Sequence, residues 1–196
     1  VPDVYYFSSK IKGVNLFILG SVHGNEPAGT NACYKLIDLL KKGKIKVKSG
    51  SITILPLPNP LGYFFNSRFQ LKPYNSDINR NFIDTGKDRI SQIILKHVNK
   101  SDFIIDLHEG YGFNRISSWS VGSTLIHTQF KKAENTAKIM IKKLNKTIKN
   151  ENYKFNLLKK EINNCTPNGS LGCYCQKNKK EYILVETTGQ NDIQPL

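Results

Sequence analysis

Short apolar runs alternate with segments of helical periodicity along this chain, and this alternation constrains its fold more than any other feature. Residues 14–19, VNLFIL, lie between Gly13 and Gly20 and predict a buried strand, because a run this short is not a helix. Further strands are predicted at residues 51–57, 103–107 and 182–185, and helices at residues 27–42, 87–98 and 129–149. The order predicts an α/β fold with a mostly parallel, mixed central sheet and helices on both faces.

Composition limits the class of protein further. The chain has 196 residues, within the usual range for one domain, so we expect residues 1–196 to form a single domain. Its 39% hydrophobic and 22% charged residues are typical of a soluble globular protein, and no apolar run approaches the roughly 20 residues of a transmembrane helix. The sequence begins at Val1 without a signal-like segment, so a targeting segment could be missing, and a cytoplasmic, periplasmic or secreted location stays open.

The chain is strongly basic. Its 29 lysines and arginines against 15 acidic residues give a net charge of +14, which would attract anionic substrates, cell-wall polymers, membranes or nucleic acid. Only four of the basic residues are arginines, whereas direct reading of bases favours the arginine fork. We therefore expect no specific nucleic-acid partner.

The four cysteines are too few for a disulfide scaffold in a chain of this length. Cys33 falls in a predicted helix and is expected to be buried. Cys165, Cys173 and Cys175 crowd into one segment, where either one disulfide with one free thiol or three reduced thiols are compatible with the spacing. Their spacing lacks the paired C-x2-C pattern of structural zinc sites, which argues against a metal there.

Four ionisable residues directly follow predicted strands: His23, Glu26, His108 and Glu186. Ligands of α/β sheets collect beyond the carboxyl ends of the strands, so these four side chains should converge at one edge. His23 and Glu26 are three residues apart with Gly24 between them, so a compact turn can direct both toward one point. Because a catalytic zinc ion typically has three protein ligands of this kind and an open position, we expect His108 to be the third ligand.

Six features in order resemble the zinc carboxypeptidases of the M14 type and the related succinylglutamate desuccinylase/aspartoacylase family. They are HGNE at 23–26, NPLG at 59–62, Arg68, DINRNF at 77–82, DLH at 106–108 and ETTG at 186–189. The resemblance implies a zinc carboxypeptidase-like fold and one bound zinc ion. It implies these roles: zinc ligands His23, Glu26 and His108; general base and acid Glu186; carbonyl-polarising Arg68; and carboxylate-binding Asn79 and Arg80.

The chemistry of these residue types agrees with the implied roles. Glu186 could take a proton from a zinc-bound water and later give it to the leaving amine. Arg68 could stabilise the oxyanion, and Arg80 could bind a carboxylate through two parallel hydrogen bonds. We therefore expect a hydrolase that cleaves an amide beside a carboxylate-bearing residue, as a carboxypeptidase or a murein-peptide amidase does.

Two other functions remain open. The first is an N-acyl amino acid deacylase with the same machinery, which would also act on a substrate with a free carboxylate. The second is a non-catalytic basic binding protein, against which the presence of Glu186 and Arg68 argues, since binding alone needs neither. Structural roles are possible too, because Arg80 could simply pair with Asp77 or Asp84.

Departures from the family pattern concern the substrate. Leu61 stands where larger peptidases of this type have aspartate, and the chain resembles the compact members. We expect two loops, residues 116–128 and 163–175, to shape specificity. Asp106 could orient a ligand histidine. Tyr111 and Trp119 could line the pocket, although packing in the core is the simpler expectation.

Overall fold

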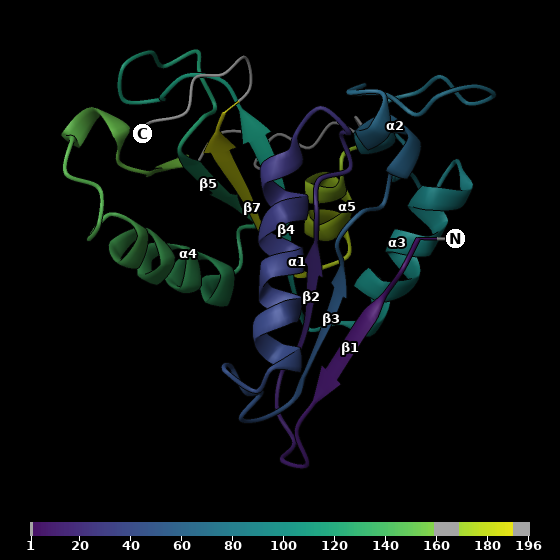
Figure 1. Cartoon of the computed structure of the whole chain (residues 1–196), viewed down its shortest axis with the longest axis horizontal. Coiled ribbons are helices and arrows are strands. Elements are labelled where there is room, and N and C mark those ends of the chain that lie inside the picture. The colour runs from purple at the N-terminus through teal and green to yellow at the C-terminus, as the bar shows by residue number, and fades with distance from the viewer. Residues whose placement is uncertain (1, 159–168, 190–196) are drawn as a thin grey trace.

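A mixed seven-stranded sheet forms the centre of the computed structural model, which describes residues 2–158 and 169–189 (Figure 1). The strands are β1 (Tyr5–Ser8), β2 (Asn15–Leu19), β3 (Ser51–Leu55), β4 (Phe103–Gly110), β5 (Thr124–His127), β6 (Asn156–Leu158) and β7 (Glu181–Thr188). The helices are α1 (Pro27–Lys41), α2 (Pro60–Phe64), α3 (Arg89–Lys100), α4 (Lys131–Leu144) and α5 (Leu171–Lys177), with 3-10 turns η1 (Ile78–Arg80) and η2 (Glu151–Tyr153).

The strand order is β1-β3-β2-β4-β7-β5-β6. The pairs β2–β3, β2–β4, β4–β7 and β5–β6 are parallel, whereas β1–β3 and β5–β7 are antiparallel. This mixed, mostly parallel sheet confirms the predicted fold class. The last described strand, β7, lies inside the sheet between β4 and β5.

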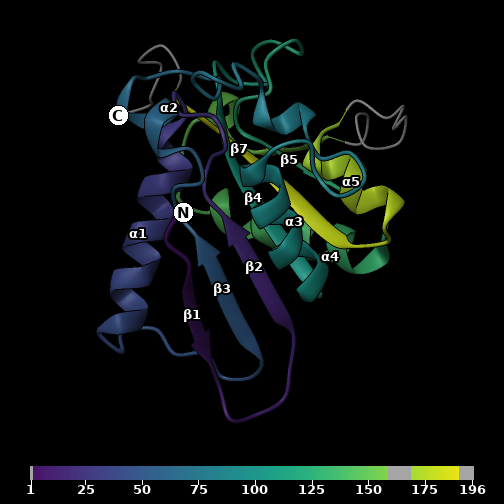
Figure 2. The same ribbon diagram turned by 90° about the vertical axis from the view of Figure 1, so that its right-hand side faces the viewer.

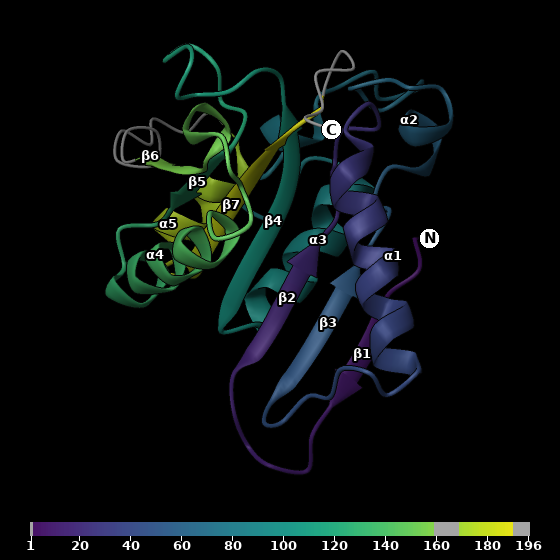
Figure 3. The same cartoon turned by 60° about the vertical axis from the view of Figure 1, so that its left-hand side comes forward.

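Helices α1 and α4 cover one face of the sheet. Cys33, Ile37 and Leu40 of α1 pack on Ile18 and Ile54. The other helix, α4, contributes Ala133 and Ala137 to a second cluster on β5 and β7, and Leu107 packs against both clusters. The two helices are seen in front of the sheet in Figure 1 and from another side in Figure 3.

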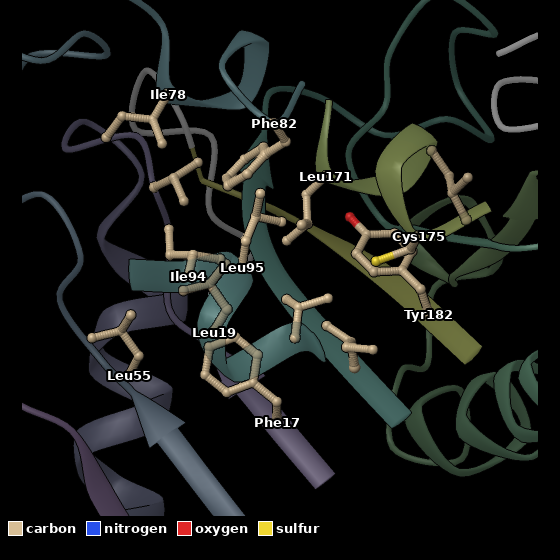
Figure 4. Close-up of a cluster of buried hydrophobic side chains, with 14 residues drawn as sticks. Phe17, Leu19, Leu55, Ile78, Phe82, Ile94, Leu95, Leu171, Cys175 and Tyr182 are labelled. Carbon is tan, nitrogen blue, oxygen red and sulfur yellow. The ribbon is translucent and has the colours of Figure 1, made fainter. Parts of the chain in front are cut away.

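Helices α3 and α5 cover the opposite face, as Figure 2 shows. The main core cluster lies between them and the sheet (Figure 4). It contains Phe17, Leu19, Ile94, Leu95, Val98, Ile104, Leu171, Cys175 and Tyr182 among others. Because side chains alternate along a strand, Asp106 and His108 project to the same face as Ile104. The second half of β4 therefore places the ionisable side chains of Asp106 and His108 on the face that α3 and α5 cover.

Several elements differ from the predictions. Strands β4 and β7 run beyond the predicted ends, so His108 and Glu186 lie within strands rather than after them. The segment predicted as the loop 116–128 contains β5, and α5 begins at Leu171 within the predicted loop 163–175, of which residues 163–168 lie outside the described part. Helix α4 ends at Leu144, and the short helix α2 follows the proline-rich segment.

None of the helices in the described part is long and apolar enough to cross a membrane. Cys33 and Cys175 are buried free thiols, and Cys173 is disulfide-bonded. Cys165 lies outside the described residues. Of the two predicted arrangements, the structure therefore has the disulfide with one free thiol nearby.

Candidate metal and active site

His23, Glu26 and His108 meet at the carboxyl edge of β2 and β4. Glu26 Oε1 lies 2.7 Å from His23 Nδ1, and Glu26 Oε2 lies 2.9 Å from His108 Nδ1. All three side chains are buried, and one ligand atom from each lies within 4.8 Å of the others. The structure thus brings together the three predicted ligands.

Local sequence sets this geometry. Pro27 occupies the first turn of α1, which fixes where the helix begins and leaves Glu26 at its N-terminal boundary. Gly24 packs directly on the backbone of Gly62 and Tyr63, where a β-carbon would come within 1.9 Å of the Gly62 carbonyl carbon. The turn therefore holds His23 and Glu26 against the start of α2.

Two aspartates face the outer nitrogens of the histidine rings. Asp77 Oδ1 lies 3.0 Å from His23 Nε2. Asp106 Oδ1 lies 3.4 Å from His108 Nε2, and neither atom has an aligned hydrogen-bond partner in the described part of the chain. Carboxylates in this position favour a histidine whose other nitrogen is free to ligate a metal. The inward Nδ1 atoms and the Glu26 carboxylate form an N, O, N donor set that fits zinc.

The charges of this cluster perturb its own pKa values. Burial alone would raise the pKa of Glu26, but the charges and hydrogen bonds of His108 and His23 outweigh burial and hold it far below its usual value. The pKa of Asp77 is also lowered against the effect of burial, mainly by His23 and then by Arg68. Burial would lower the pKa of His108, whereas Asp106 and Glu26 raise it well above its usual value. The carboxylates are thus anionic and attract cations.

Glu186 lies beside His108 in the parallel pairing of β4 and β7. Burial, opposed in part by the charge of His108, raises the pKa of Glu186 to about 8. A carboxyl group with a pKa near the working pH can both accept and donate a proton. The structure gives this residue the environment of an acid–base group.

Arg68 lies between two carboxylates. Its Nη1 donates to Glu26 Oε1 at 3.1 Å, while its Nε and Nη2 donate to Asp77 Oδ2 at 3.2 and 3.1 Å. Asp77 therefore pairs with Arg68, and the alternative pairing of Arg80 with Asp77 or Asp84 is wrong for the described residues. The Arg68 side chain remains 37% exposed, so one side of the guanidinium is accessible.

Asn79 and Arg80 lie in the 3-10 turn η1. The Asn79 side chain accepts a hydrogen bond from Leu171 N at 2.9 Å, which ties this turn to the start of α5. Arg80 Nη1 donates to the Asn79 carbonyl oxygen at 2.7 Å. Within the described ranges no carboxylate forms an ion pair with Arg80, whose charge is available to a ligand.

All seven predicted site residues line one cavity of about 400 Å³. Tyr111 and Trp119 also line this cavity and are 57% and 95% exposed, so the expectation that they pack in the core is wrong.

Sequence reasoning missed the roles of three residues. Asp77 is the first residue of the DINRNF motif, and that position was its only signal. Tyr182, a fully buried residue of β7, donates a 2.8 Å hydrogen bond to Asp106 Oδ2. Nothing in the sequence distinguishes it from an ordinary strand residue. Glu109, to which no role was assigned, accepts from the Ala28 backbone N–H at 2.9 Å and so caps α1.

Residues 12–137 match the family model of the succinylglutamate desuccinylase/aspartoacylase catalytic domain. The chain belongs to this family. The match covers the motifs of the three predicted metal ligands, of Arg68 and of the Asn79–Arg80 pair. No curated protein matches the chain in sequence.

Solved structures share the fold of this family member. A variant of the cell shape determinant Csd4 from Helicobacter pylori has a TM-score of 0.79 at 20% identity, covering 95% of this chain and 49% of that one. A succinylglutamate desuccinylase from a Silicibacter species has a TM-score of 0.65 at 16% identity, with 93% and 52% coverage. An aspartoacylase family protein from Mesorhizobium loti has a TM-score of 0.60 at 19% identity, with 96% and 62% coverage. The chain spans about half the length of Csd4.

Proposed function

We propose that this protein is a zinc-dependent hydrolase that cleaves an amide bond beside a carboxylate-bearing residue. The observation that carries the proposal is a single cavity that joins a His-Glu-His donor set, a largely buried Glu186 and Arg80, which forms no ion pair with a carboxylate of residues 2–158 or 169–189. Family membership supports hydrolytic chemistry, since the family is named for two hydrolases. We further propose that the chain acts as one catalytic domain, because all seven described strands belong to one sheet.

His23, Glu26 and His108 would hold the metal, with Asp77 and Asp106 orienting the two imidazole rings. A zinc ion bound there supplies Lewis acidity, which lowers the pKa of a water and polarises a carbonyl. The ligand atoms come from a turn and a strand that are buried against the core. Because these ligand atoms have fixed positions, they favour a catalytic metal site over a loosely bound surface ion.

Glu186 would move the proton in this reaction. Its carboxylate would accept a proton from the attacking water, and the resulting carboxylic acid would donate it to the leaving amine. Burial favours the protonated form of Glu186, which suits the second task of donating a proton to the amine. Arg68, which is partly exposed beside Glu26, would stabilise the negative charge that develops on the carbonyl oxygen.

Arg80 would bind the substrate carboxylate. A guanidinium can make two parallel hydrogen bonds to a carboxylate, which orient as well as attract. Asn79 holds the turn in place, because its side chain accepts a hydrogen bond from Leu171 N. Its carbonyl oxygen accepts a hydrogen bond from Arg80 Nη1 and so positions the guanidinium. Substrates without a carboxylate should therefore bind weakly.

Peptides are the substrate class that we favour, because Csd4, which shares this fold, is described as a D,L-carboxypeptidase. The second candidate is an N-acyl amino acid deacylase, which the family model itself favours through the desuccinylase and aspartoacylase names. Both candidates use the same residues. A non-catalytic basic binder would need neither Glu186 nor Arg68.

The test combines metal content with hydrolysis. Wild type, Glu186→Gln and the matched control Glu151→Gln, which changes an exposed carboxylate, would be analysed for bound zinc and assayed on peptides and N-acyl amino acids. We expect all three to bind one zinc ion, with hydrolysis retained in the control and reduced at least about a thousandfold in Glu186→Gln. Absence of zinc from the wild type, or equal hydrolysis by wild type and Glu186→Gln, would refute the mechanism.

A further inference from the structure

Trp119 is the single tryptophan of the chain, and its side chain is 95% exposed at the wall of the active-site cavity. Large aromatic side chains normally bury most of their surface, because removing apolar area from water is favourable. An aromatic side chain left in solvent beside a catalytic cavity is therefore a candidate ligand contact.

The loop that carries Trp119 has a defined structure. It connects β4 to β5 and rises above the carboxyl edge of the sheet (Figures 1 and 3). Asn114 binds across the loop, since its backbone N–H donates to the Gly122 carbonyl and its side chain donates to the Ser120 carbonyl, both at 2.9 Å. Phe113 anchors the base of the loop by stacking on Tyr153 with ring centroids 4.3 Å apart. The exposure of Trp119 thus belongs to an ordered loop.

The cavity has an apolar side that includes Trp119. Val121, Ile126 and Leu184 line the same cavity and come from the end of this loop, from β5 and from β7. Arg68 and Arg80 belong instead to the connection that leaves β3. Arg80 lies in η1, which Leu171 ties to the start of α5, whereas Trp119 lies in the loop from β4 to β5, so the two residues reach the same cavity from different segments. A substrate whose carboxylate is bound by Arg80 and whose other end passes the metal ligands can extend toward Trp119.

We propose that Trp119 is a specificity-determining residue that packs on the part of the substrate beyond the scissile amide, and that it selects peptides over small N-acyl amino acids. This inference rests on the proposed function. A peptide has backbone and side chains on the acyl side that can cover an indole ring. A short acyl group, such as acetyl, is too small to cover it. The indole then contributes to binding of peptides alone.

Two measurements test the inference. Because Trp119 is the only tryptophan, the intrinsic tryptophan fluorescence of zinc-loaded Glu186→Gln reports this side chain alone. We expect a peptide with a free carboxyl terminus to change its intensity or emission maximum, and an N-acetyl amino acid to leave both unchanged. In steady-state assays, Trp119→Ala should raise KM for peptides about tenfold with kcat within about twofold, and leave KM for N-acetyl amino acids unchanged.

Control variants separate this contact from a general effect. Trp119→Phe keeps an aromatic ring and should recover most of the peptide KM, while Tyr6→Ala removes a 65% exposed aromatic side chain of β1 and should change nothing. The inference is overturned if Trp119→Ala affects both substrate classes equally or neither. If peptides change the fluorescence and yet no substrate is hydrolysed, the proposed function fails while the contact stands. If peptides are hydrolysed without any fluorescence change, the contact fails and the function stands.

Discussion

The Tyr182 hydroxyl donates a 2.8 Å hydrogen bond to Asp106 Oδ2, and both side chains are fully buried. Asp106 in turn faces the outer nitrogen of His108 at 3.4 Å. Burial and the nearby charge of Asp106 raise the pKa of Tyr182 well above its usual value, so the hydroxyl keeps its proton and remains a donor. A residue of the sheet interior thus supports a proposed metal ligand through an aspartate.

Replacing Tyr182 by phenylalanine should weaken both the fold and the metal site. The variant leaves a buried carboxylate with one partner fewer, which should lower the free energy of unfolding by about 1–3 kcal/mol. Urea denaturation of the metal-free protein measures this change, and competition with a zinc chelator should show about tenfold weaker zinc binding. The matched control is Tyr174→Phe, whose hydroxyl donates to Asn99 at an exposed site and whose loss should cost less than about 0.5 kcal/mol. Unchanged zinc affinity in Tyr182→Phe would show that Asp106 does not depend on this bond.

Asp77→Asn should reduce zinc affinity about 10–100-fold, because the side chain orients His23 and balances Arg68. Its control is Asp84→Asn, which removes an exposed carboxylate of the same segment. Equal affinity for the two variants would contradict the role of Asp77.

Gly24→Ala should disrupt the turn that carries His23 and Glu26. A β-carbon there would overlap backbone atoms of Gly62 and Tyr63, which cannot move aside as a flexible side chain can. We expect a loss of about 3 kcal/mol or more in the free energy of unfolding and loss of zinc binding. Gly43→Ala is the comparison, since no atom lies within 4 Å of its β-carbon position. Its positive φ is unfavourable for alanine, so we expect this variant to lose about 1 kcal/mol in the free energy of unfolding. Similar stabilities for both variants would argue against close packing of the turn on α2.

Cys33 should be unreactive in the native protein. Burial, with the charge of Asp106, raises the pKa of its thiol to about 12, so almost no thiolate exists near pH 8. Alkylation should be slow until denaturant is added. Because the pKa is higher in the folded state than in the unfolded state, the associated stability is complete below pH 9 and declines as the pH rises toward 12. The urea midpoint of wild type should therefore fall more steeply over this range than that of Cys33→Ala.

The sequence predicted the central strands because each is a short, mostly apolar run packed on both faces of the sheet. Strands β2, β3, β4 and β7 were found in this way. Helices α1, α3 and α4 were found from the helical spacing of their apolar residues, and the family from its ordered motifs. Strands β1, β5 and β6 were not, because they have only three or four residues and owe their place to pairing with distant strands. Helix α5, with seven residues, is too short to show a clear helical period.

The seven predicted site residues line one cavity, but sequence motifs did not reveal what holds them there. His23 and Asp77 are separated by 54 positions and Tyr182 and Asp106 by 76, so neither contact has a local pattern. Arg68 was predicted to polarise the carbonyl, but no motif predicted its ion pairs with Glu26 and Asp77. Such pairings depend on where the loops between strands lie at the carboxyl edge of the sheet, and sequence motifs do not specify this.

The place of β7 in the sheet has a consequence for biosynthesis. This strand, the last in the described chain, separates β4 from β5 and brings Glu186 beside His108. While the ribosome is still adding earlier residues, β5 and β6 have no central strand to join, and the parallel pairing of β4 must wait for its distant neighbour. A nascent chain could bring His23, Glu26 and His108 together before β7 is made, but Glu186 would join these proposed metal ligands only when β7 pairs with β4. Completion of the sheet and assembly of the proposed site are thereby the same event.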